Sequence, residues 1–213
     1  EGGDVEIWYP ADESTRGGSV AYNVSDFLPE GIAGLITGDI DDSFTIAATR
    51  DAAPAADGPF PVVLFSHGAA SFRLQSSELA RHLASWGIVT ASTDHPSRDL
   101  LNRFGGTADG QPPAIEQMRS MRTALGELGD DQVLGGALDT ERVALGGHSA
   151  GGGTVAEMAS DPDILGYVSY ASGLGDAAPA VPSLFMAGTL DTIVDPVERT
   201  QAAFETAPPP SWF

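Results

Sequence analysis

The pentapeptide Gly147-His148-Ser149-Ala150-Gly151 constrains this chain more than any other stretch. The apolar run 142–146 before it predicts a short buried strand, and the small-residue run 151–158 after it predicts a helix. A strand that turns at once into a helix brings the residues on either side of its apex close together, so a Cβ on either glycine would collide. A plain glycine turn would explain the pentapeptide alone. The strand-turn-helix setting instead favours a nucleophilic serine, Ser149, at the apex.

Length and composition favour one domain without covalent cross-links. The 213 residues suffice to bury a full core, and the chain has no cysteine. This excludes a disulfide scaffold, a thiol nucleophile and a thiolate zinc site. The absence of cysteine does not decide the compartment, although a secreted protein is slightly favoured over a cytoplasmic one. No apolar run reaches the roughly 18 residues of a membrane helix, so we expect no transmembrane segment.

The charge of the chain argues against polyanionic partners. Thirty acidic residues face ten basic ones, all of them arginine, which gives a formal net charge of −20. Nucleic acid and anionic membranes are therefore poor partners. Two explanations of the acidity stay open: the composition of a GC-rich genome, and adaptation to high salt.

Apolar runs alternate with helix-like segments over most of the chain. This alternation predicts a single α/β domain over residues 1–213, with a mostly parallel sheet and helices on both faces. The predicted strands are Val5–Tyr9, Ser43–Thr49, Pro61–Ser66, Ile88–Thr93, the run from Arg142, Tyr167–Ala171 and Ser183–Ala187. The predicted helices are Ser76–Trp86, Pro113–Leu128, with apolar residues at helical spacing, and Pro196–Thr206.

Segments with potentially reactive residues follow four of these strands. They are Ser66-His67-Gly68-Ala69-Ala70, Asp94-His95-Pro96, the Ser149 turn and Gly188-Thr189-Leu190-Asp191. In an open parallel sheet, the carboxyl ends of the strands meet at one edge, where ligands bind. The sequence therefore predicts a site at that edge.

With these residues the chain resembles the α/β-hydrolase superfamily. It is most similar to the branch of dienelactone-hydrolase-like and platelet-activating-factor-acetylhydrolase-like esterases and related bacterial cutinases. The resemblance covers roughly residues 43–206, and Val5–Pro10 is similar to the opening strand of the acetylhydrolase-like group. Three segments carry it: Pro61–Gly68, Gly147–Gly153 and Pro182–Asp195.

The resemblance implies a serine ester hydrolase that works through an acyl-enzyme on small or short-chain esters and needs no cofactor. Ser149 would be the nucleophile, and Asp191 would orient a catalytic histidine. The oxyanion hole would use the N–H groups of Ala150 and Ala69. Asp195 is the competing carboxylate, but its place before Pro196 is typical of a helix cap.

Two departures from the cutinases bear on the substrate. Cutinases usually have methionine after the serine and an aromatic residue in the oxyanion turn, where this chain has Ala150 and Ala69. The tryptophan common near the cutinase site is replaced in the run Tyr170–Gly173. Small soluble esters are therefore expected, and a cutinase-like polyester hydrolase is the alternative.

The histidine of such a triad follows the acid in the chain, yet all four histidines here precede Asp191. A helix and a strand are expected between acid and base, and Pro208–Phe213 reads as the start of that strand. We therefore expect the last strand and the histidine loop to lie beyond Phe213, in a C-terminal segment or on a second chain. If no further histidine exists, a non-catalytic binding protein of the same fold is the alternative.

The visible histidines have ordinary structural interpretations. His148 is expected to point into the fold, His67 to structure its turn, and His82 to lie on a helix. His95 is the rival base, because it follows a strand. A metal site from His67, His95 and Asp94 is disfavoured, since no ligand spacing on one element supports it.

Overall fold

A computed structural model describes residues 4–174 and 179–213, and its elements follow the predicted alternation. Over these residues the strands are β1 (Val5–Trp8), β2 (Val20–Asn23), β3 (Ser43–Ile46), β4 (Phe60–Ser66), β5 (Val89–Thr93), β6 (Leu138–His148), β7 (Ile164–Tyr170), β8 (Ser183–Met186) and β9 (Ser211–Trp212). The helices are α1 (Glu30–Ala33), α2 (Ser77–Ala84), α3 (Leu100–Gly105), α4 (Ala114–Gly126), α5 (Ala150–Met158) and α6 (Ala202–Thr206), with short 3₁₀ turns at Glu13–Thr15, Val24–Phe27 and Leu128–Asp130. A π-helical stretch, Pro196–Gln201, runs directly into α6, so the helix predicted over 196–206 is present in two parts.

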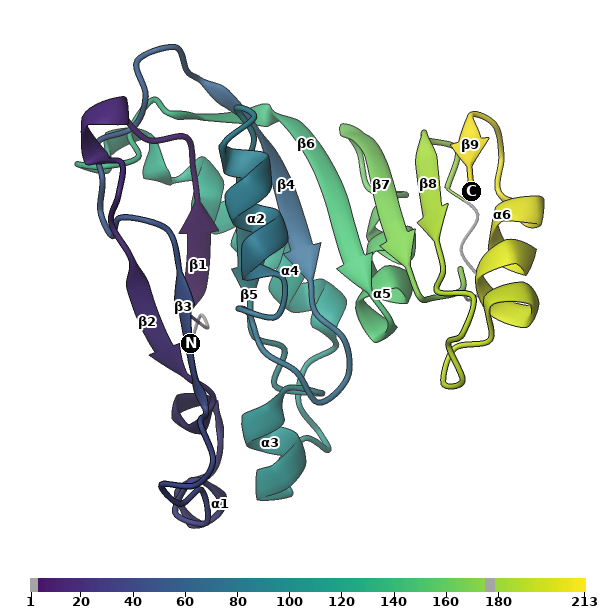
Figure 1. The fold of residues 1–213 in the computed structure, drawn as a ribbon. Coiled ribbons are helices and arrows are strands. Elements are labelled where there is room, and N and C mark those ends of the chain that lie inside the picture. The colour runs from purple at the N-terminus through teal and green to yellow at the C-terminus, as the bar shows by residue number, and fades with distance from the viewer. Residues whose placement is uncertain (1–3, 175–178) are drawn as a thin grey trace.

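Seven strands form one sheet in the order β1-β5-β4-β6-β7-β8-β9 (Figure 1). β1 is antiparallel to β5, and every other neighbouring pair in this sheet is parallel. α2 lies in front of the sheet in Figure 1, and α4 and α5 lie behind it. The predicted α/β architecture, a mostly parallel sheet with helices on both faces, is therefore confirmed. The carboxyl ends of β4 to β8 consequently meet at one edge.

The segment between β1 and β4 holds a strand that the sequence pattern did not reveal. β2 pairs antiparallel with β3 in a separate two-stranded sheet, at the left in Figure 1. We expected only a connection before the strand at Ser43. β2 could not be predicted because it has only four residues. Two are half-buried and two are exposed, and this alternation is too short to indicate a strand.

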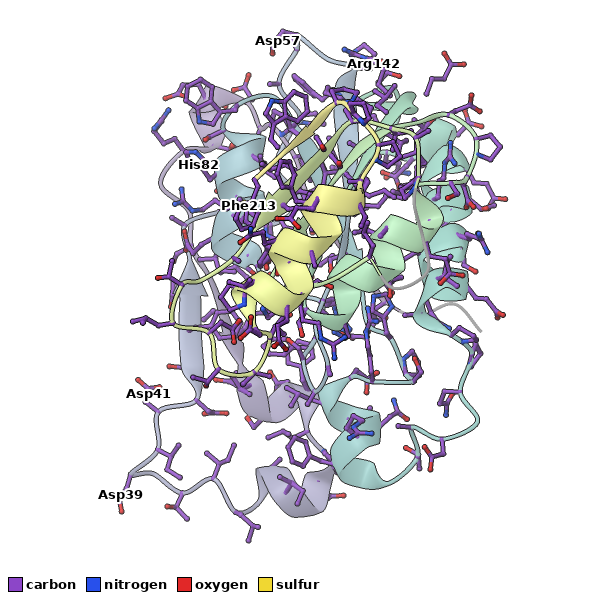
Figure 2. The ribbon with its side chains drawn as sticks, turned by 90° about the vertical axis from the view of Figure 1, so that its right-hand side faces the viewer. Asp39, Asp41, Asp57, His82, Arg142 and Phe213 are labelled. Atoms are coloured by element: carbon purple, nitrogen blue, oxygen red, sulfur yellow. The ribbon has the colours of Figure 1, made fainter. Side chains whose placement is uncertain are left out.

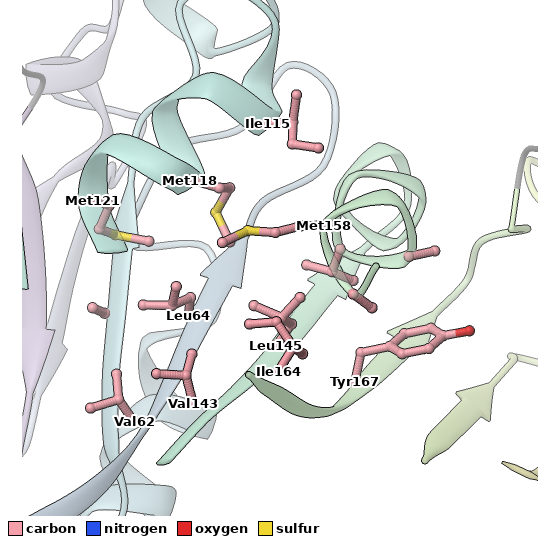
Figure 3. Packing of buried hydrophobic residues seen from close by; sticks show 14 of the residues in the cluster. Val62, Leu64, Ile115, Met118, Met121, Val143, Leu145, Met158, Ile164 and Tyr167 are labelled. Atoms are coloured by element: carbon pink, nitrogen blue, oxygen red, sulfur yellow. The ribbon is translucent and has the colours of Figure 1, made fainter. Parts of the chain in front are cut away.

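The main core lies between the sheet and α4 with α5. Ile115, Met118, Met121 and Leu125, the residues predicted to form the inner face of the helix over 113–128, are all buried. Figure 3 shows the methionines of this face beside Leu64 of β4 and Met158 of α5. Burial of such side chains contributes about 1.5–3 kcal/mol each, so this layer holds the central strands in place.

A smaller apolar cluster connects the N-terminal part of the chain to the segment before α2. Its buried members are Trp8, Phe27, Leu74 and Ala80. Phe72 packs against it, with its ring 4.5 Å from that of Phe27. This cluster therefore fixes the chain immediately after the loop that follows β4.

The end of the chain adds a strand to the sheet. Ser211 pairs with Ser183 and Trp212 with Leu184, so β9 runs parallel to β8. The interpretation of Pro208–Phe213 as the start of a strand is confirmed, and the histidine loop expected after that strand stays a prediction. On the α2 side, an apolar groove of about 1050 Å³ extends along the sheet from α2 to Trp212.

Among the described residues, no helix is both long and apolar enough to cross a membrane.

The turn around Ser149 is as crowded as the sequence predicts. Ser149 lies between β6 and α5 with φ 53° and ψ −122°. A Cβ on Gly147 would lie 2.3 Å from the carbonyl oxygen of Gly151, and one on Gly151 would lie 2.0 Å from that of Ser66. Backbone atoms meet backbone atoms here, so no side-chain adjustment relieves the contact.

We expect Gly151→Ala to lower the free energy of unfolding by about 1–3 kcal/mol or more, because the new methyl group collides with β4. Gly153 lies on the same helix with open space around its Cα, so Gly153→Ala is the matched control. It should leave stability unchanged or raise it by up to about 1 kcal/mol through helix propensity. Urea unfolding of both variants is the measurement. Equal stabilities would contradict the crowding argument.

Candidate active site

Ser149 occupies the apex that the pentapeptide predicts, at the carboxyl edge of the sheet. Its N–H donates to the carbonyl oxygen of Tyr170 at 3.0 Å, which ties the apex to the end of β7. The positive φ of this serine is unusual for a residue with a side chain, and such conformations concentrate at functional sites. The half-buried serine thus combines a fixed backbone with a position at the edge where ligands bind.

The loop after β4 lies directly against this apex. A Cβ on Gly68 would be 3.3 Å from the Cβ of Ser149, so the loop and the apex are in contact. The Gly68 N–H donates to Gln75 Oε1 at 2.8 Å, and the Ala70 N–H donates to the carbonyl oxygen of Arg98 at 2.7 Å. Between them, the N–H of Ala69 has no acceptor among the described residues. It remains able to bind a substrate oxygen.

The N–H of Ala150 likewise has no hydrogen-bond acceptor among the described residues. Ala150 is the first residue of α5, where an N–H has no partner within the helix, and no described residue accepts a hydrogen bond from it. The positive end of the helix dipole adds to its attraction for an anion. The two N–H groups that the resemblance assigns to an oxyanion hole are therefore both without an acceptor among the described residues.

Asp191 follows β8 at the same edge of the sheet. Its Oδ1 accepts hydrogen bonds from the N–H groups of Ile193 and Val194, each at 2.9 Å. These bonds, and to a smaller extent the nearby His148, hold the pKa of Asp191 below its ordinary value of 3.8. The carboxylate is therefore ionised at neutral pH and lies close enough to the residue before Ser149 to interact with it electrostatically.

Asp195 caps a helix, as its place before Pro196 predicts. Its Oδ1 accepts from the N–H groups of Val197 and Glu198 at 2.8 Å each, at the start of the helical stretch 196–201. Both aspartates thus bind two backbone N–H groups. They differ in that Asp191 interacts with the Ser149 turn through His148.

His67 and His95 are stacked, with ring centroids 4.5 Å apart, and neither side chain is exposed. His95 Nε2 is 2.9 Å from Ser66 Oγ, and its backbone N–H donates to His67 Nε2 at 3.1 Å. Burial lowers the pKa of His67 to about 4 and that of His95 to about 2. Both rings are neutral, enclosed side chains, so His95 does not lie open to a substrate as the rival base would.

The metal site weighed from His67, His95 and Asp94 finds no support. Asp94 accepts a hydrogen bond at 2.7 Å from the N–H of Arg73 and pairs with the Arg73 guanidinium. Among the described residues, no cluster of three or more histidine and carboxylate side chains is arranged to hold a metal ion. Asp94 instead ties the end of β5 to Arg73, in the segment before α2.

The remaining two histidines also follow their structural interpretations. His148 Nδ1 is 2.6 Å from Gln75 Nε2, the His148 ring lies 5.0 Å from that of Tyr170, and burial lowers the pKa of His148. His82 is exposed on α2 and is labelled in Figure 2.

Two polar residues that the sequence did not single out support the site. Gln75 contacts both Gly68 and His148. Arg98 donates to Ser66 Oγ at 2.7 Å, to Thr154 Oγ1 at 2.9 Å and to the carbonyl oxygen of Ala150 at 3.1 Å. Burial lowers the pKa of this guanidinium to about 10. Apart from the Gln75–Gly68 bond, which spans seven residues, these bonds join segments at least 32 residues apart, so no local sequence pattern indicates either residue.

We expect the free energy of unfolding to fall as the pH falls from about 6.5 toward 5, before most carboxylates titrate. The unfolded imidazoles of His67 and His95 take up protons near their ordinary pKa of 6.5, whereas the folded ones stay neutral to about 4 and about 2. The unfolded chain then binds more protons, and each histidine contributes up to about 1.4 kcal/mol per pH unit.

Urea unfolding between pH 7.5 and 5 measures this slope. His82→Asn, at an exposed position, is the control and should retain the slope, whereas His67→Asn should reduce it. A stability that does not change over this range would contradict the neutrality of the buried pair.

Comparisons with known proteins bear on these segments. A family described as platelet-activating factor acetylhydrolase, isoform II, matches residues 2–102, which include the loop after β4, Gln75 and Arg98 but not Ser149. The platelet-activating factor acetylhydrolase of Cavia porcellus is 24% identical over 193 residues. That alignment covers 73% of this chain and 43% of the relative, so the chain spans less than half the length of the relative. In sequence and in fold, the chain thus resembles the platelet-activating-factor-acetylhydrolase-like esterases of the α/β-hydrolase superfamily.

Proposed function

We propose that the protein is a serine carboxylic-ester hydrolase that forms an acyl-enzyme on Ser149. One observation carries the proposal: Ser149 lies at a sharp strand-to-helix turn in contact with the loop after β4, and the N–H groups of Ala69 in that loop and of Ala150 have no acceptor among the described residues. This is the arrangement that acyl transfer to a serine requires. The resemblance to acetylhydrolases supports the same class of reaction.

The proposed reaction has two halves. Ser149 Oγ attacks the ester carbonyl carbon while a base takes its proton, and the carbonyl oxygen becomes an oxyanion that the N–H groups of Ala69 and Ala150 stabilise. The tetrahedral intermediate collapses, the bond to the alcohol oxygen breaks, and the alcohol leaves with the proton. Water then attacks the acyl-enzyme in the same way, which releases the carboxylic acid and restores Ser149.

We further propose that the base is a histidine outside the printed sequence, on polypeptide that follows Phe213 or on a second chain, and that Asp191 orients it. The placement of the visible histidines supports this. His67 and His95 are enclosed, His82 lies on the outside of α2, and His148 is bound to Gln75. Asp191, ionised and close to the Ser149 turn, is well placed to hold the imidazolium that forms during the reaction.

The proposed substrates are esters of short acyl groups. The side chains beside the two oxyanion donors are the methyl groups of Ala69 and Ala150, which add little apolar contact for a long acyl chain or a polymer. The matched relatives carry the name acetylhydrolase, which favours a two-carbon acyl group.

Ser149→Ala should lower the turnover of a short-chain p-nitrophenyl ester at least about 1000-fold, because no acyl-enzyme can form. The assay uses the protein as its gene encodes it. A fluorophosphonate should label the natural protein and not the variant, and the melting temperature should hardly change. Ser160→Ala, at an exposed position near the end of α5, is the control and should retain both activity and labelling. Substantial activity in the Ser149 variant would refute the proposed function.

Asp191→Asn and Asp195→Asn separate the two carboxylates. Asparagine keeps an oxygen for both backbone N–H groups in each case, so the substitutions remove mainly charge. We expect the Asp191 variant to lose about 10²–10⁴-fold in kcat, because the base is no longer held in the right tautomer, and the Asp195 variant to change a few-fold at most. A greater loss at Asp195 would reverse the assignment.

A further inference from the structure

We propose that Gln75 is a positioning residue: its amide holds the His67–Gly68 peptide group, and with it the loop after β4, against the Ser149 turn, and so helps to direct the Ala69 N–H toward the reacting oxygen. The inference rests on the proposed function and adds a residue to it. Neither the sequence pattern nor the comparisons assign a role to this glutamine.

The amide of Gln75 bridges two segments that are far apart in the chain. Its Oε1 lies 2.8 Å from the Gly68 nitrogen, and its Nε2 lies 2.6 Å from His148 Nδ1. A backbone N–H can only donate, so Oε1 must face Gly68 and Nε2 must face the histidine. His148 Nδ1 therefore accepts a hydrogen bond, and the ring proton lies on Nε2. Gln75 thus joins the loop after β4 to the residue immediately before the nucleophile.

Gly68 is held at its carbonyl as well. His67 Nδ1 lies 2.8 Å from the Gly68 carbonyl oxygen. Because His67 Nε2 accepts the backbone N–H of His95, the ring proton of the neutral His67 lies on Nδ1 and is donated to Gly68. Burial lowers the pKa of His67 to about 4, so at neutral pH Nε2 stays an acceptor and the single ring proton stays on Nδ1.

The two bonds together fix the direction of the Ala69 N–H. The Gly68 carbonyl and the Ala69 N–H belong to one trans, planar peptide group, in which they point in opposite directions. The bond to His67 holds this peptide group at its oxygen, and the bond to Gln75 holds the preceding group at the Gly68 nitrogen, so rotation about both backbone bonds of Gly68 is restricted. The hydrogen bond to the carbonyl also polarises the peptide group, which strengthens the N–H as a donor.

The close contact at Gly68 explains why another residue must supply the hydrogen bonds that orient the loop. A Cβ there would lie 3.1 Å from His148 Nδ1 and 3.3 Å from Ser149 Cβ. The loop therefore approaches the Ser149 turn through a residue without a side chain, and a hydrogen-bonding group from elsewhere must set its orientation. Gln75, just before α2, supplies both a donor and an acceptor.

Three variants of the protein as its gene encodes it test the role. Gln75→Leu keeps the size and removes both bonds, and we expect kcat on a short-chain ester to fall about 10–100-fold with KM changed less than threefold. Affinity for a boronic acid, whose tetrahedral adduct places an oxygen in the oxyanion hole, should fall in parallel. Gln75→Glu keeps the acceptor for Gly68 and should restore kcat to within about fivefold. Gln132→Leu, at an exposed position away from the site, is the control and should match the natural protein.

A second readout does not depend on activity. Nitrogen NMR of the His148 ring should show the proton on Nε2 in the natural protein and on Nδ1 in Gln75→Glu, where a carboxylate replaces the amide donor. If Gln75→Leu does not fold, this shift together with the kcat of Gln75→Glu decides the question.

Three results would overturn the inference: a Gln75→Leu kcat within twofold of the natural value, a Gln75→Glu kcat as low as that of the leucine variant, or a His148 ring proton on Nδ1 in the natural protein. Any of these, found while Ser149→Ala is inactive, would leave the proposed function standing. Activity in Ser149→Ala would instead remove the proposed function itself.

Discussion

The contact of backbone with backbone beneath Ser149 is the constraint on which the rest of the structure depends. Gly151 touches the carbonyl of Ser66, and Gly147 touches that of Gly151, so β4, β6 and α5 approach more closely than any side chain would allow. This approach forces the serine into its left-handed conformation. It also places the loop after β4 within contact of the serine, because the end of β4 is itself one wall of the turn.

A second property of the site is that its supporting polar groups are enclosed. The rings of His67 and His95 and the guanidinium of Arg98 connect β4, the loop after it and the start of α5 by hydrogen bonds, with the rings kept neutral by burial. Buried polar groups are costly unless they are bonded, and for that reason a bonded network favours one arrangement over near alternatives. Under the proposed function, the donors of the oxyanion hole would thus be held in place before the substrate binds, which is what electrostatic stabilisation of an oxyanion requires.

The features that could be predicted from the sequence are those that depend on neighbours in the chain. The inner face of α4 follows from apolar spacing, the Ser149 turn from its glycines, and the cap at Asp195 from the proline after it. β2 could not be predicted, because four residues carry too little alternation. Gln75 and Arg98 could not be predicted either, since each acts on partners 7 to 73 residues away and polar residues in loops are common. The candidate residues Ser149 and Asp191 could thus be proposed from the sequence, whereas the residues that hydrogen-bond the surrounding segments could not.

The smaller apolar cluster around Trp8 and Phe27 supports this arrangement of the site. It anchors Phe72 and Leu74, which lie between the loop that bears Ala69 and the glutamine that orients it. Trp8 and Phe27, from the N-terminal part of the chain, thus help to hold the segment that carries Ala69 and Gln75. Under the proposed function, a substitution in this cluster would change the rate through the orientation of one peptide group, although the substituted side chain does not contact the substrate.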